Sequence, residues 1–462
     1  MRDIDAFVSR EGSRMLSELM DFLRIPSVST DPARDDDCRR AALWMAEHLR
    51  SLGCAELELL GSDTHPVVHG EGPPVPGRPR VLIYGHYDVQ PAGPLEAWLS
   101  PPFDPEVRGG NLHARGATDD KGQLFALVKA FEAASREGRP PVNVRFLIEG
   151  QEESGGEVLL ALARERPELM RADVVLVADG PWYAPGWPSA EVAVRGICYA
   201  EIDVQTLAED RHSGLYGGVA PNAHEALVRI LAALKSPGGR IRVPGLYQRV
   251  VRPPRSERDS WKALPLDLEA FTRDEVGAAT LAGDPRRTVQ ERLWALPTLD
   301  IHGIAGGYTG EGAMTVIAAQ ARAKVSLRLV PEQRAGEVLE QLTAAVRAAA
   351  PDHARVEVRP LFLADPVLVD VGHPASSHLN RAFQEVEGRG LSLTRSGGSL
   401  PILGELAAGS GAVLVAGLGL PDDNMHAPNE KFSVEQFLKG VRVFGRLLDY
   451  LADDTIINGG GA

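Results

Sequence analysis

Cysteine is scarce in this chain of 462 residues. The three cysteines, Cys38, Cys54 and Cys198, are an odd number without any CxxC spacing. A disulfide framework needs paired cysteines, and a zinc site made of thiolates needs closely spaced ones. The sequence therefore indicates neither, and we expect ordinary buried or surface thiols.

Hydrophobic runs are short throughout the chain. Nowhere do about 18 or more apolar residues follow one another, which is the length that a membrane-spanning helix requires. The N-terminal segment, MRDIDAFVSREG, has no basic stretch followed by an apolar one, as an export signal would have. The sequence therefore predicts a cytoplasmic protein.

Basic residues are fewer than acidic ones in this chain. Lysine and arginine together number 49, against 63 aspartate and glutamate residues, which gives a formal net charge of −14. Nucleic acids and anionic membranes are polyanions, so such a chain would repel both. We expect neither as a partner, and a small molecule as the substrate.

Strand and helix patterns alternate in the first part of the chain. Short apolar runs of β type occupy 80–84, 145–150 and 173–180. Between the first two, 121–138 has apolar residues at helical spacing, which predicts a helix packed by one face, and a further amphipathic helix is predicted at 13–23. This alternation is typical of an α/β layer with a mostly parallel sheet flanked by helices.

The pattern changes near residue 194, and the chain length also favours two domains. Strand patterns at 193–206, 314–330 and 356–361 surround two amphipathic helices, which predicts a small α+β module. The stretch 237–305 is rich in proline and arginine and has little periodicity, so it is interpreted as an insertion of uncertain structure. After about residue 365 the first pattern returns. We therefore predict one domain from 1–193 and 365–462, with the module 194–364 inserted in it.

His86 and Asp88 stand two residues apart, just after the first apolar strand. In an extended chain they lie on the same side, so the aspartate can accept the second N–H of an imidazole that binds a metal. The alternative is a histidine and an aspartate in a surface turn, because an isolated HxD has little meaning without ligands from elsewhere.

Acidic residues form two further clusters. Asp119 and Asp120 precede a predicted helix, where they can serve as helix caps or can bridge two metal ions. Glu149, Glu152 and Glu153 follow the second apolar strand. They form either a solvated acidic loop or a site that needs a compensating cation.

Two more candidates complete the set. Asp179 ends the third apolar strand, and His426 lies in a polar turn after a fourth one at 412–419. A parallel sheet brings the carboxyl ends of its strands to one edge, where ligands commonly bind. Two histidines and three carboxylates suit Zn²⁺, with Mn²⁺ or Co²⁺ as alternatives. The sequence thus predicts a two-metal hydrolytic site.

At these residues the chain resembles the aminoacylase, carboxypeptidase and dipeptidase family of dinuclear zinc hydrolases. Seven motifs match in order over most of the chain: GHYDV, GATDDKG, EGQEESG, VADG, RHSGLYGG, RLVPEQ and HAPNEKF. The resemblance implies that one ion is held by His86, Asp119 and Asp179, and the other by Asp119, Glu153 and His426. Asp119 would then bridge the two ions.

The resemblance also implies an amide hydrolase. Glu152 matches the general acid/base, which exchanges protons with water and the leaving amine, and Asp88 matches the support of His86. The inserted module matches a lid and dimerisation domain, from which His212 reaches the scissile carbonyl, often in the other subunit. We therefore expect a homodimer.

Three further positions match residues that contact the substrate. Arg328 is implied to bind the substrate carboxylate by bidentate hydrogen bonds, and Thr315 and Ser399 match neighbouring contacts. The long insertion after RHSGLYGG resembles the larger-lid dipeptidases related to carnosine dipeptidases, although Ser396 stands where those enzymes often carry an acid. We expect dipeptides or similar small peptide-like substrates. The alternatives are an N-acyl-amino-acid deacylase or related amidohydrolase, and a binding protein without catalysis.

Overall fold

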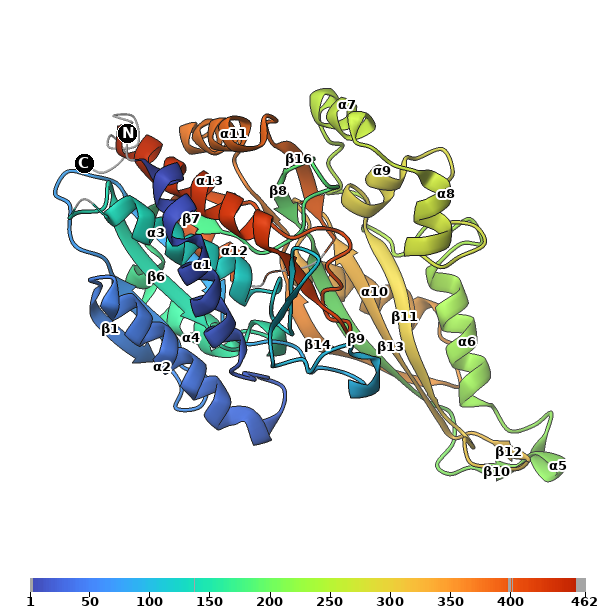
Figure 1. Cartoon of the computed structure of the whole chain (residues 1–462). Coiled ribbons are helices and arrows are strands. Elements are labelled where there is room, and N and C mark those ends of the chain that lie inside the picture. The colour runs from blue at the N-terminus through green and yellow to red at the C-terminus, as the bar shows by residue number, and fades with distance from the viewer. Residues whose placement is uncertain (1–2, 137, 398–399, 401, 454–462) are drawn as a thin grey trace. The chain divides into compact units, whose positions relative to one another are not determined.

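The computed structural model describes residues 3–136, 138–397, 400 and 402–453 (Figure 1). The chain forms two compact units. Unit 1 comprises Met1–Val192, Val369–Thr394 and Leu400–Ala462, and unit 2 comprises Ala193–Leu368 and Arg395–Ser399. Two segments, one long and one short, therefore interrupt the sequence of unit 1 and make up unit 2.

Unit 1 is built on a six-stranded sheet with the order β1-β2-β6-β3-β7-β17. Four neighbouring strands of this sheet run parallel: β6 (Asn143–Glu149), β3 (Arg80–His86), β7 (Ala172–Val177) and β17 (Ser410–Val415). The antiparallel pair β1 (Ala55–Leu60) and β2 (Val67–Glu71) completes one edge. The parallel strands are those that the apolar runs predict, because a strand covered on both faces needs no polar face. The predicted fold class is confirmed.

Helices cover this sheet, and one of them is itself enclosed. They include α1 (Ile4–Leu23), α2 (Asp35–Ser51), α3 (Lys121–Ser135), α11 (Pro374–Glu387) and α13 (Val434–Asp453). Every residue of α3 except Glu132 and Ser135 is buried, because α1 and α13 contact α3 as well as the sheet does (Figure 1). The prediction that this helix packs by one face is therefore wrong.

The first helix is longer than predicted. It begins at Ile4 rather than near residue 13, and the Asp3 side chain caps it by accepting a hydrogen bond from the Ala6 N–H. Its first turns bury Phe7 and Val8.

Unit 2 contains a four-stranded antiparallel sheet with the order β11-β13-β9-β14. The strands are β9 (Gly196–Gln205), β11 (Thr298–Gly306), β13 (Gln320–Leu329) and β14 (Arg355–Ala364). Two amphipathic helices, α6 (Ala223–Leu234) and α10 (Ala335–Ala349), contribute with these strands to a second hydrophobic core. This is the α+β module that the sequence predicts.

The stretch 237–305 has more structure than its sequence indicates. It forms α7 (Arg255–Ala263), α8 (Leu268–Ala270), α9 (Val289–Trp294) and the edge strand β11. The strand escapes prediction because Gly303 and Gly306 interrupt its alternation and most of its residues are exposed. A part-buried ion pair between Arg395 and Glu257, with N–O distances of 2.7 and 2.9 Å, anchors α7 in unit 2.

Shorter elements complete both units. In unit 1 they include β4 (Glu106–Arg108), β5 (Asn111–His113), β18 (Lys431–Ser433), α4 (Glu157–Glu165) and α12 (Leu403–Gly409). Unit 2 has β10 (Arg211–His212), α5 (Ser213–Tyr216) and β12 (Val316–Ile317), and the connecting segments form β8 (Ser189–Val194), β15 (Val367–Leu368) and β16 (Ser392–Ser396). All three cysteines are unpaired and buried. Among the described helices, none combines the length and apolar character needed to cross a bilayer.

Candidate metal centre

The carboxyl ends of the parallel strands gather the predicted residues of unit 1. His86 is the last residue of β3, and Asp179 lies two residues beyond β7. Glu152 and Glu153 form a 3₁₀ turn, Glu152–Ser154, shortly after β6. The chain can present these side chains together because parallel strands end at one edge of the sheet.

Asp119 and His426 reach the same place from loops. Asp119 precedes α3 and is joined to Asp120 by a cis peptide bond. His426 adopts a left-handed backbone conformation with φ of 61° in the turn after β17. Both residues therefore depend on loop conformation for their position, unlike the residues at strand ends.

The five side chains form two sets that share Asp119. His86 Nε2 lies 3.2 Å from Asp119 Oδ1 and 3.8 Å from Asp179 Oδ2. His426 Nε2 lies 2.8 Å from Asp119 Oδ2 and 3.2 Å from Glu153 Oε1. Within each set, one potential ligand atom per residue lies within 4.8 Å of the others. The two oxygens of Asp119 thus face different histidines, as a bridging carboxylate requires.

The donor set fits a pair of cations. Among the described residues, the buried atoms His86 Nε2 and Glu153 Oε1 meet polar atoms only of other potential ligands, which leaves them poorly satisfied unless an ion lies between them. Two imidazoles with three carboxylates suit zinc, manganese or cobalt. Nitrogens and oxygens that face one another within 4.8 Å are what a metal ion would use.

The electrostatics of the cluster also call for positive charge. Burial, reinforced by Asp119, raises the pKa of Asp179 to about 7. Burial also raises the pKa of Glu152 well above its ordinary range, and the neighbouring Asp179 and Glu153 add to the effect. Hydrogen bonds to Asp119 and Glu153 raise the pKa of His426 to about 10. Anions this close repel one another, and a cation would relieve the repulsion.

The alternatives left open by the sequence do not describe this region. The Asp120 side chain is fully buried and makes no capping hydrogen bond to α3; its Oδ2 accepts from the His86 backbone N–H at 3.3 Å. Glu149 is 2% exposed and accepts a hydrogen bond from the Tyr84 hydroxyl, and the Glu153 side chain is 4% exposed. These acids are therefore neither simple caps nor a solvated loop.

Asp88 contacts more than the histidine that the sequence assigns to it. His86 Nδ1 is closer to the backbone oxygen of Asp88, at 3.0 Å, than to its carboxylate, at 3.4 Å. The carboxylate accepts from Ser29 Oγ at 2.6 Å and from the backbone N–H groups of Glu152 and Glu153 at 3.2 and 3.1 Å. Asp88 therefore holds both the histidine and the turn that carries the two glutamates.

Comparison with known proteins agrees with this geometry. Residues 82–450 match the model described as "Peptidase family M20/M25/M40". The chain belongs to this family. That membership confirms the prediction that the protein is a metallopeptidase-type hydrolase.

Relatives match over nearly the whole chain. Cys-Gly metallodipeptidase dug1 of Schizosaccharomyces pombe is 31% identical over 96% of this chain and 97% of its own length. Beta-Ala-His dipeptidase of Rattus norvegicus is 30% identical over 95% of this chain and 93% of its own length. The crystal structure of human carnosine dipeptidase 1 superposes with a TM-score of 0.81 at 28% identity, covering 98% of both chains.

Some residues at the candidate site of this family member were not predicted. Gln90 Nε2 donates to Glu153 Oε2 at 2.8 Å, and its place two residues after Asp88 in the same extended segment is a signal that could have indicated it. Glu430 accepts hydrogen bonds from the loop of Asp119, although it stands four residues after His426. No periodicity links those two loops, so only the tertiary structure places Glu430.

The candidates for substrate contact lie in unit 2. His212 on β10 pairs with Val316 on β12, and its Nδ1 accepts from the Gly214 N–H. The backbone oxygen of Thr315 accepts from the Ser213 N–H at 3.0 Å, so Thr315 lies beside the His212 turn. Arg328 lies near the other end of β13, opposite Ile197, and Ser399 lies outside the described residues. The structure thus brings His212 and Thr315 together but not Arg328.

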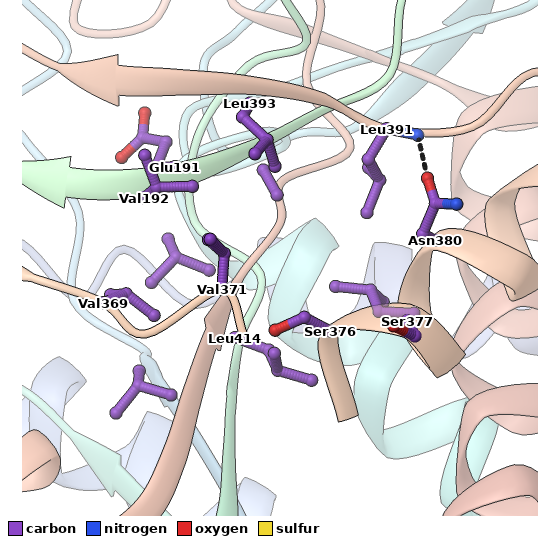
Figure 2. Close-up of a pocket in the computed structure, with 14 residues that line it drawn as sticks. Glu191, Val192, Val369, Val371, Ser376, Ser377, Asn380, Leu391, Leu393 and Leu414 are labelled. Carbon is purple, nitrogen blue, oxygen red and sulfur yellow. Dashed lines mark hydrogen bonds between the residues drawn. The ribbon is translucent and has the colours of Figure 1, made fainter. Parts of the chain in front are cut away.

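A separate cavity of about 320 Å³ lies within unit 1 (Figure 2). Aliphatic side chains dominate its lining, including Val192, Val369, Leu393 and Leu414, and Glu191 is among the few polar ones. None of the five clustered residues lines it. The cavity is therefore distinct from the candidate metal centre.

Proposed function

We propose that this family member is a dinuclear metallodipeptidase that hydrolyses the amide bond of dipeptides or similar small peptide-like substrates. The observation that carries the proposal is the pair of ligand sets that share Asp119. The activities for which two relatives are named, Cys-Gly dipeptidase and Beta-Ala-His dipeptidase, support the substrate class.

His86, Asp119 and Asp179 would hold one ion, and Asp119, Glu153 and His426 the other. We expect zinc, with manganese or cobalt as alternatives, because imidazole and carboxylate ligands suit all three. When bound, such ions lower the pKa of water and polarise the carbonyl that is attacked. The bridging role falls to Asp119 because its two oxygens face different histidines.

Glu152 is the proposed general acid/base. It belongs to neither ligand set, yet it adjoins Glu153, and the Asp88 carboxylate fixes the backbone of both. A carboxylate that no ion holds is free to accept the proton of the attacking water and to pass it to the leaving amine nitrogen. Adjacent glutamates therefore divide two tasks, ion binding and proton transfer.

The substrate carboxylate would bind Arg328, whose guanidinium can donate two parallel hydrogen bonds. His212 would stabilise the oxyanion that develops on the scissile carbonyl, and Thr315 and Ser399 would add further contacts. These roles come from the family resemblance. Their supporting observation is the placement of His212 and Thr315 on one turn.

The length of β13 favours a shared active site in a homodimer. The His212 turn lies beyond the Gln320 end of β13, whereas Arg328 is eight residues along that strand (Figure 1). Eight strand residues span about 26 Å, but a dipeptide extends only about 7 Å. One substrate therefore cannot touch both residues of the same subunit. We propose that His212 serves the site of a second subunit.

Exposed apolar residues of unit 2 support a dimer. Ile301 and Ile304 on the edge strand β11 are 47% and 54% exposed, and Leu215 and Val219 beside His212 are 76% and 85% exposed. An open strand edge with apolar side chains is a surface that other chains can cover.

Unpaired buried thiols agree with a reducing compartment, so the proposed location is the cytoplasm.

A substrate panel tests the activity. The metal-free protein is supplied separately with Zn²⁺, Mn²⁺ and Co²⁺, and is assayed against unblocked dipeptides and against N-acetyl and N-succinyl amino acids. We expect release of amino acids from the dipeptides. Hydrolysis of the acyl compounds alone would assign the protein to the deacylases instead, and two bound ions without any turnover would make it a binding protein.

A mixed dimer tests the shared site. The variants H212A and E152Q are each expected to be nearly inactive, whereas a mixed dimer holds one site with both native residues. Equal mixing forms half of the dimers as heterodimers with one such site, so about a quarter of wild-type activity is expected. If His212 served its own subunit, mixing would restore no activity.

A further inference from the structure

Glu430 joins the loop of His426 to the loop of Asp119. Its carboxylate is fully buried within unit 1. Oε1 accepts from the backbone N–H groups of Thr118 and Asp119 at 2.9 and 3.1 Å. Oε2 accepts from the Gly116 N–H at 3.0 Å and from Arg115 Nη1 at 2.7 Å. Both oxygens therefore have two donors each.

The backbone of Glu430 makes the same connection. Its carbonyl oxygen accepts from the Ala114 N–H at 3.1 Å. Five donors of the segment 114–119 thus converge on one residue of the His426 turn. Only a carboxylate offers enough acceptor sites for the four side-chain bonds, because the amide of glutamine has a single acceptor oxygen.

Other contacts link these segments through residues that are not themselves potential ligands. Gln123 Oε1 accepts from the Leu418 N–H at 2.6 Å, and its Nε2 donates to the Thr118 carbonyl at 2.9 Å. Thr118 Oγ1 donates to the Lys431 carbonyl at 2.5 Å. Glu430 differs from these because it binds the backbone N–H of Asp119 itself.

We propose that Glu430 is a positioning residue of the metal centre. It holds the Asp119 backbone against the turn that carries His426, so that Asp119 Oδ2 and His426 Nε2 stay 2.8 Å apart and face one cation. The inference rests on the proposed function, because it takes Asp119 and His426 as ligands. Groups that orient metal ligands typically change affinity by about 10- to 100-fold when they are lost.

The variant E430Q tests the proposal by metal affinity rather than by turnover. Metal-free protein is titrated with Zn²⁺ in competition with a chromogenic chelator, which resolves two dissociation constants. We expect one of the two ions to bind about 10- to 100-fold more weakly in E430Q. If E430Q fails to fold, E430D retains the charge beside Arg115 but withdraws the carboxylate, and a smaller loss of affinity is expected.

The matched control is N143D, another exchange between amide and carboxylate in unit 1. Asn143 begins β6, at the strand end opposite the candidate centre, and its side chain holds the Val75 and Arg78 backbone. Its Zn²⁺ affinities should equal those of the wild type. Unchanged affinities in folded E430Q or E430D, or an equal loss in N143D, would overturn the inference. If the wild-type protein itself bound fewer than two ions, the proposed function would fail as well.

Discussion

Among the described residues of unit 1, two regions gather histidine with two or more acids whose potential ligand atoms lie within 4.8 Å of one another, yet only one is a candidate metal centre. In the first, His86, His426 and three acids meet at the ends of the parallel strands. In the second, Glu18, His48 and Glu132 come from α1, α2 and α3, and their potential ligand atoms also lie within 4.8 Å of one another. Residue types and spacing alone do not separate the two.

The two regions differ in whether a lysine side chain occupies the cluster. Lys129 is fully buried, and its Nζ lies 2.8 Å from His48 Nε2, 2.5 Å from Glu18 Oε2 and 2.7 Å from Glu132 Oε2. The second region, Glu18, His48 and Glu132, is called the helix cluster below. It already holds the Lys129 ammonium in the position that a metal ion would take. At the sheet edge, within the part of the chain that the structure describes, the ion pairs between the clustered residues involve only their own two histidines. A cluster of ligands predicts a metal only where no side-chain cation fills it.

The largest contrast is expected from removing one acid in each region. D119N should lose both ions, because Asp119 belongs to both ligand sets, and hydrolysis should fall by at least about 10³-fold. E132Q changes an acid of the helix cluster and should retain two ions. Metal content by mass spectrometry of the purified proteins checks both. Two ions in D119N, or loss of metal in E132Q, would reverse the assignment of the regions.

A second change separates chemistry from ion binding within the sheet-edge region. E152Q should lower kcat by about 10²- to 10⁴-fold while two ions remain bound, because the amide cannot transfer the proton. Glu157, exposed at the start of α4, supplies the control E157Q, which should keep wild-type turnover. Steady-state kinetics with metal analysis measures both quantities. Full turnover in E152Q would exclude it as the general acid/base.

The candidate metal centre at the sheet edge is easier to predict from the sequence than the helix cluster. His86 and Asp179 end or follow apolar strands, so the parallel sheet alone brings them together. His426 lies eleven residues beyond Val415, the end of β17, and its placement depends on the Glu430 contacts. The apolar run 412–419 before it makes that histidine a candidate, and the resemblance to known hydrolases assigns it to a particular ion.

The helix cluster and the edge strand β11 could not be read from local patterns. Lys129 lies on a helix whose spacing predicts an exposed polar face, but α1 and α2 supply the groups that bury and pair it. β11 combines glycines with exposed residues and takes its strand form from pairing with β13. In both cases, partners distant in sequence decide the structure.

Removing the internal cation tests the comparison through stability. K129M removes the buried ammonium, while Arg14 still pairs with Glu18 and Glu132, so we expect unfolding to become easier by about 1.5–3 kcal/mol. The exposed pair of Arg50 with Glu47 gives the control R50M, with an expected change within about 0.5 kcal/mol. Urea denaturation of the metal-free proteins measures the difference. Equal stability of the two variants would mean that Lys129 does not complete its cluster.

The smallest expected effect concerns the pH dependence of the helix cluster. Burial, with the positive charge of Lys129, lowers the pKa of His48 from 6.5 to about 4. The unfolded chain then binds a proton between these values that the folded chain does not, so stability is complete above pH 6.5 and is lost as the pH falls toward 4. From pH 7.5 to 5 the loss from this residue is up to about 2 kcal/mol. Urea denaturation at both pH values should show a smaller decrease in stability for H48Q than for the wild type. An identical decrease would mean that His48 takes up its proton over the same pH range in the folded and unfolded chains, and that Lys129 does not lower its pKa.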